Sequence, residues 1–164
     1  MNEILQIMFY LQQTRKPYTQ ITLPSGYIIN VYLDKKLKEI VNPGSDFTNL
    51  QLLYFGYYLQ DNPVMQEIIQ IWGTDEFSEL PERIQNALLE HEIGHAICQH
   101  NLKMPSNYNR KDYVHFELEA DTYVTDKEAL EDFLLKSIEA TEKGLMNGDI
   151  EEYYLRIQAL HGEI

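Results

Sequence analysis

The feature that most restricts the fold of this chain is the run ERIQNALLEHEIGHAICQH, residues 82–100, in which two histidines stand four positions apart. Apolar residues recur through the run at helical spacing, so we expect a helix over about 80–101 with Pro81 near its start. At about 100° per residue, His91 and His95 then share one face, one turn apart. The fold must therefore place two imidazoles side by side on a largely apolar helix.

Two imidazoles on one face can bind the same divalent ion, because each can direct a ring-nitrogen lone pair at it. Glu92 follows His91 directly and lies beside the histidine face, where its carboxylate can hold a water molecule without being a ligand itself. Gly94 has no side chain and permits close approach of another backbone. The alternative interpretation is two hydrogen-bonded core histidines beside a surface glutamate.

A third ligand is needed, because catalytic zinc usually has three protein ligands and an open position. The segment VHFELEADTYV, 114–124, predicts a second helix with Glu117 and Asp121 on one face. Glu117 can be presented to the ion, and Asp121 can accept a hydrogen bond from a ligand histidine and fix its tautomer. The alternative for this segment is an acidic helix with a solvated face.

The other residues near the motif are weaker candidates for the third ligand. A longer zinc motif would need a glycine and a histidine where the chain has Cys98 and Asn101. We expect Cys98 to be a small core residue. The helical spacing predicts that His100 lies on the opposite side of the helix from His95.

HEIGH followed by ELEAD resembles the gluzincin metallopeptidases, in which His-Glu-x-x-His precedes Glu-x-x-x-Asp on a later helix. The run ALLEHEIGHAICQH with ELEADTYV is most similar to the ImmA/IrrE-type metallopeptidases. The resemblance covers residues 84–124 and nothing beyond them. It implies three Zn²⁺ ligands, which are His91, His95 and Glu117. It also implies Glu92 as the general base and Asp121 as support for a ligand histidine.

The resemblance implies a zincin-like domain and a zinc-dependent metalloendopeptidase, as in a dedicated regulatory or phage-type protease. Tyr113, His115 and Tyr123 flank the third-ligand helix and are candidate donors to the substrate oxyanion.

The alternative function is a catalytically silent binding or structural component of a virion or complex. Glu92 argues against that alternative, because a scaffold has no need of a base. A purely structural zinc site is disfavoured, because such sites usually have four Cys or His ligands and Cys98 is the only cysteine.

The rest of the chain predicts a mostly helical α+β fold in one domain, 1–164, with a small N-terminal β element. ITLPSGYIINVYL, 21–33, predicts two short strands joined through Pro24-Ser25-Gly26. The second strand is a candidate sheet edge for a substrate peptide, with a buried strand as the alternative. Residues 34–46 are predicted to be a strand end or turn and a loop, and 101–113 another loop. Further helices are predicted near 2–13, 47–60, 63–72, 125–144 and 149–162.

The net charge is −13, and most of the acidic excess lies in residues 117–164. Such a surface repels nucleic acids and anionic membranes, so the expected partner is a protein or peptide substrate. The acidic region is either a solubilising face or a docking face for a basic protein partner.

The sequence shows no apolar run of about 18–20 residues and no basic signal-peptide start, and its single cysteine excludes an internal disulfide. The predicted location is the cytoplasm, with association with a virion as the alternative.

Overall fold

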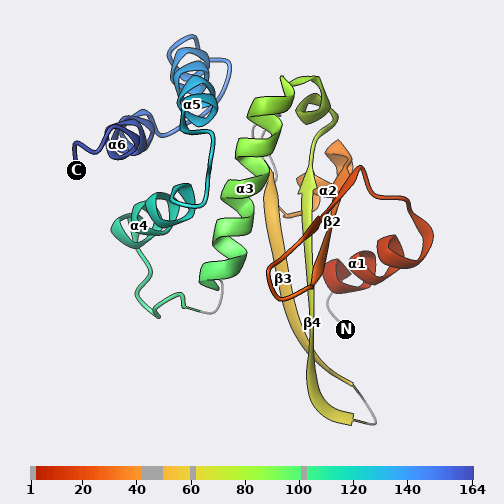
Figure 1. Cartoon of the computed structure of the whole chain (residues 1–164). Coiled ribbons are helices and arrows are strands. Elements are labelled where there is room, and N and C mark those ends of the chain that lie inside the picture. The colour runs from red at the N-terminus through yellow and green to blue at the C-terminus, as the bar shows by residue number, and fades with distance from the viewer. Residues whose placement is uncertain (1–2, 42–49, 60–61, 101–102) are drawn as a thin grey trace. The chain divides into compact units, whose positions relative to one another are not determined.

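A computed structural model describes residues 3–41, 50–59, 62–100 and 103–164. The chain divides into two compact units, Met1–Phe77 and Ser78–Ile164. Figure 1 shows, among the described residues, a sheet with two helices in the first unit and a group of α-helices in the second. The α+β class is therefore confirmed, and the single domain over 1–164 stays a prediction.

The first unit contains strands β1 (Thr19–Thr22), β2 (Ile28–Leu33), β3 (Gln51–Leu59) and β4 (Asn62–Gly73), which form one sheet of order β1-β2-β4-β3. β2 pairs antiparallel with β1 and parallel with β4, and β3 pairs antiparallel with β4. Gly26, with φ +89°, lies in the turn between β1 and β2, so the hairpin predicted for 21–33 is confirmed. The helices α1 (Glu3–Thr14) and α2 (Lys35–Val41) belong to the same unit.

The core of the first unit lies between α1 and the sheet. Apolar residues of α1 are spaced three apart and share one buried face. They pack with residues from α2, β2, β3 and β4 in one cluster of Leu5, Met8, Leu11, Tyr32, Leu37, Leu53, Ile68 and Trp72. The buried Trp72 indole donates to Gln70 Oε1 at 2.9 Å, and the Gln70 amide donates to the Met8 carbonyl at 2.9 Å. The helix predicted near 2–13 is thus confirmed.

Three predictions in the first unit are wrong. The helices predicted at 47–60 and 63–72 are strands β3 and β4, because runs rich in aromatic and β-branched residues favour a pleated sheet. Part of the predicted loop at 34–46 is α2, which starts where Asp34 Oδ1 accepts a 2.8 Å hydrogen bond from the Lys36 amide. Residues 42–49 and 60–61 lie outside the described part. For the strand at 28–33, the buried-strand alternative holds and the peptide-binding edge does not, because β2 lies between β1 and β4.

The second unit consists of α3 (Glu82–Cys98), α4 (Arg110–Asp121), α5 (Lys127–Glu142) and α6 (Ile150–Leu160), preceded by a 3₁₀ turn at Asp75–Glu79. α3 packs against α4 and α5, and α6 packs against α4 and α5. None of the described helices has the length and apolar content needed to cross a membrane.

Local capping explains where the helices of the second unit begin. Asn109, Asp126 and Asp149 are N-caps whose side chains each accept a hydrogen bond from the amide three residues ahead. The helices predicted near 125–144 and 149–162 are therefore confirmed. α4 begins earlier than predicted, because Asn109 and Asp112 form a reciprocal capping box inside the expected loop.

Candidate metal centre

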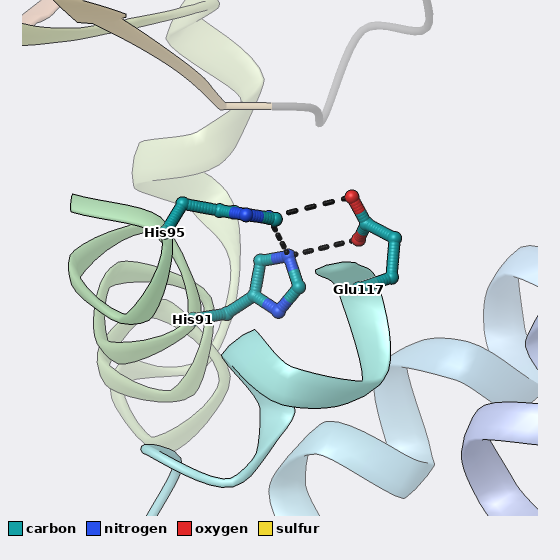
Figure 2. Close-up of side chains that lie close together, drawn as sticks. All are labelled: His91, His95 and Glu117. Carbon is teal, nitrogen blue, oxygen red and sulfur yellow. Dashed lines mark hydrogen bonds and ion pairs between the residues drawn. The ribbon is translucent and has the colours of Figure 1, made fainter. Parts of the chain in front are cut away.

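Side chains from α3 and α4 converge on one point in the second unit. Figure 2 shows that His91, His95 and Glu117 point toward one another. His91 Nε2 lies 3.1 Å from His95 Nε2 and 3.0 Å from Glu117 Oε2. His95 Nε2 lies 3.3 Å from Glu117 Oε1. A tetrahedral zinc ion with bonds of about 2.0–2.1 Å holds its ligand atoms about 3.3 Å apart, so the three groups are spaced as ligands of one such ion.

Gly94 allows α3 and α4 to approach closely enough for this convergence. A β-carbon at Gly94 would lie 2.6 Å from the carbonyl oxygen of Ala120 and 2.9 Å from its Cα. Both are backbone atoms, so any side chain at residue 94 would push α4 away. The close approach expected of this glycine is confirmed, and it brings Glu117, three residues before Ala120, to the histidine face.

Asp121 fixes the orientation of the first histidine. His91 Nδ1–H donates to Asp121 Oδ1 at 2.7 Å, which leaves Nε2 facing His95 and Glu117. Asp121 is buried, and it accepts two hydrogen bonds from Arg156, from Nε at 2.7 Å and from Nη2 at 2.9 Å. The structure thus places Asp121 where a partner of a ligand histidine is expected.

The charges of the site favour a bound cation. Burial lowers the pKa of His91, but Glu117 and Asp121 outweigh it and raise that pKa to about 10. Burial raises the pKa of Glu117, but His91, His95 and Arg156 bring it well below its usual range. Without a metal ion, the site therefore holds a proton on His91 beside an ionised Glu117. A divalent ion can replace that proton.

Sequence reasoning missed the buried Arg156 of α6. Its Nη1 lies 3.5 Å from Glu117 Oε2 and 3.4 Å from Glu152 Oε1. Burial raises the pKa of Glu152 to about 7, although Arg156 opposes that rise. The only signal in the sequence is the four-residue spacing of Glu152 and Arg156, which is common on exposed helices. Contact with Asp121, 35 residues earlier, depends on tertiary packing.

Glu92 lies beside the convergence point and is half-buried on α3. Burial raises the pKa of its carboxyl group, and the nearby His91 and His95 lower it by less, so the net shift is upward. It is outside the group of side chains whose atoms could share an ion. A carboxylate with raised proton affinity next to a metal position is suited to accept a proton.

The three candidate oxyanion donors occupy different environments. The pKa of Tyr113 is raised by burial and by the charge of Glu117, which places its hydroxyl within electrostatic reach of the site. His115 is two-thirds exposed and lies 3.4 Å from Glu119. Tyr123 is 39% exposed, about as much as Tyr113 at 40%, and it hydrogen-bonds to Cys98.

Tyr108 is a further hydroxyl near the site, from the loop before α4. Burial raises its pKa, and the charges of Glu117 and Asp112 add to that rise. Its ring stacks on Phe116 with centroids 5.9 Å apart. Sequence reasoning missed this tyrosine because the loop has no periodicity that orients its side chains.

His100 also lies at the site, contrary to the sequence prediction. α3 ends at Cys98, and Gln99 has a left-handed conformation with φ 56°. His100 therefore turns back toward the helix, and its Nδ1 lies 2.8 Å from His95 Nδ1. The prediction that His100 lies on the opposite side was wrong, because it extended the helix to residue 101. Cys98 is buried, as expected of a small core residue.

A second group of side chains of the kinds that bind metal ions lies around His100. His100 Nε2 lies 3.0 Å from Glu119 Oε1. With Cys98, these residues could offer ligand atoms within 4.8 Å of one another.

Comparisons of this chain with protein-family models, with curated proteins and with solved structures found no match.

Proposed function

We propose that this chain is a zinc-dependent metalloendopeptidase of the zincin-like, gluzincin type, with His91, His95 and Glu117 as the zinc ligands. The observation that carries the proposal is the convergence of the two histidine Nε2 atoms, 3.1 Å apart, on the Glu117 carboxylate, whose two oxygens lie 3.0 and 3.3 Å from them. Two imidazoles and a carboxylate suit zinc and would leave one coordination position open for water or substrate. Glu92, which is near enough to His91 and His95 for their charges to lower the pKa of its carboxyl group, would supply the base that a purely structural site lacks.

The residues around the site have separate tasks in peptide hydrolysis. Bound zinc supplies a Lewis acid and a water molecule that ionises near neutral pH. Glu92 accepts the proton of the attacking water and passes it to the leaving amine nitrogen. Asp121 holds the His91 ring in one tautomer. Tyr113, whose raised pKa keeps its hydroxyl protonated, donates to the substrate oxygen as negative charge develops there.

The proposal is tested by measuring bound zinc and peptide cleavage together. Elemental analysis should give one zinc per wild-type chain, and mass spectrometry of a proteome-derived peptide library should show new termini that a chelator abolishes. His91→Ala should lose both the zinc and the cleavage. His161→Ala is the matched control, because this histidine is exposed and pairs with Glu131 at 2.8 Å, and it should keep both. A wild type that binds zinc and cleaves nothing would indicate the silent binding component instead.

Zinc affinity should rise with pH. His91 has a pKa of about 10 in the metal-free site, so one proton must leave when the ion binds. Below that pKa, the affinity should increase about tenfold per pH unit. Competition with a fluorescent chelator at pH 6.5, 7.5 and 8.5 measures the slope, and calorimetry in buffers of different ionisation enthalpy counts the protons released. An affinity that does not change over this range would contradict the assigned protonation state.

A further inference from the structure

The second ligand histidine needs a hydrogen-bond acceptor that the proposed zinc site does not itself provide. To bind an ion through Nε2, a neutral His95 must carry its proton on Nδ1. For His91 the equivalent proton goes to Asp121, at 2.7 Å. The atom that faces His95 Nδ1 is instead another ring nitrogen, His100 Nδ1, at 2.8 Å.

Counting hydrogens around His100 decides which of the two nitrogens donates. An ionised Glu119 carboxylate can only accept, so His100 Nε2, 3.0 Å from Glu119 Oε1, carries a hydrogen. A neutral His100 then has a lone pair on Nδ1. His95 must therefore donate its Nδ1–H to His100, which leaves the His95 Nε2 lone pair directed at His91 and Glu117.

The His100 ring is held in a fixed position for this contact. It is 4% exposed, and it stacks on Phe116 with ring centroids 4.2 Å apart and planes 14° apart. The left-handed conformation of Gln99 sets the direction in which the chain leaves α3. An acceptor on a ring with so little freedom can orient a ligand at low entropic cost.

We propose that His100 and Glu119 are positioning residues that fix the tautomer and orientation of His95 as a zinc ligand. The proposal rests on the function proposed above. It also predicts that Cys98, His100 and Glu119 do not hold a second ion, although their ligand atoms lie close enough. An ion on His100 Nε2 would move the His100 hydrogen to Nδ1, and His95 would then have to accept it and carry its own hydrogen on Nε2. An ion on His100 Nδ1 would remove the acceptor altogether.

Zinc affinity of the full chain, measured by competition with a chromophoric chelator, tests the contact. His100→Phe keeps the stacking and removes the acceptor, and it should weaken zinc binding about 10–100-fold. His100→Asn places an amide oxygen near the position of Nδ1, and it should restore most of that loss. His161→Phe is the control, because His161 is an exposed histidine that pairs with Glu131 at 2.8 Å, and it should leave the affinity unchanged. Circular dichroism and thermal melting of the metal-free variants verify that each is folded.

Two further measurements separate the positioning role from a second metal site. Nitrogen-15 spectra of the zinc-loaded wild type should show His100 with its hydrogen on Nε2 and none on Nδ1. Wild type and Cys98→Ser should both bind one zinc per chain. A second zinc that Cys98→Ser removes, or a hydrogen on His100 Nδ1, would overturn the proposal. Equal zinc affinities of wild type and His100→Phe would overturn this proposal alone, whereas a wild type that binds no zinc would overturn the proposed function as well.

Discussion

Replacing Glu92 by glutamine is expected to lower kcat for peptide cleavage by about 10²–10⁴-fold while one zinc per chain remains bound. Glutamine has nearly the same shape as glutamate, but its amide cannot accept the proton of the attacking water. Zinc should remain because Glu92 is not among the proposed ligands, which are His91, His95 and Glu117. Single-turnover cleavage of a peptide identified in the library screen, with elemental analysis of the same sample, measures both quantities.

Glu90→Gln is the matched control for this experiment. Glu90 lies on the same helix two residues earlier, and its carboxylate accepts hydrogen bonds from the amide and the hydroxyl of Thr125 at 3.3 and 3.0 Å. The glutamine oxygen can still accept, so the cleavage rate should stay near that of wild type. If Glu92→Gln cleaved as fast as Glu90→Gln, another group would have to be the base. If Glu92→Gln lost its zinc, the carboxylate would be a ligand.

Replacing Arg156 by methionine is expected to destabilise the metal-free protein by about 3–5 kcal/mol. Methionine keeps much of the side-chain length and removes the charge that lies against Asp121, Glu117 and Glu152. These carboxyl groups are largely buried and would lose their shared cation, which costs more than the loss of an exposed ion pair. Urea unfolding of the metal-free protein measures the change.

Arg110→Met provides the comparison for Arg156→Met. Arg110 makes a bidentate contact with Asp149 on the same group of helices, but its side chain is 51% exposed. Loss of such a pair should cost about 0–1 kcal/mol. Zinc should restore part of the stability of Arg156→Met, because a divalent cation at Glu117 offsets some of the lost charge. Equal destabilisation by the two substitutions would show that the buried cation is not essential to the fold.

The features that were predicted from the sequence are set by short-range spacing. The helix carrying His91 and His95, and the placement of Glu117 and Asp121 on one face of the next helix, follow from four-residue intervals. The helix starts at Asp126 and Asp149 follow from capping, which acts over three residues.

The features that were missed depend on contacts beyond the local chain. The segments 51–59 and 62–73 are apolar and aromatic with no clear period, and they become strands by pairing with each other and, for β4, with β2. His100 was misplaced because its direction depends on the residue at which α3 ends. Arg156 lies in a third helix, and no spacing relates it to Asp121.

The 2.6 Å separation that a β-carbon at Gly94 would have from Ala120 also limits how the chain can evolve. Buried positions usually tolerate exchange among apolar side chains of similar volume, whereas here even a methyl group would meet backbone. A lineage that replaced this glycine would first need a wider spacing between α3 and α4, and with it a longer reach from residue 117 to the histidines. We therefore expect substitutions at 94 and at 117 to be inherited together among descendants of this chain.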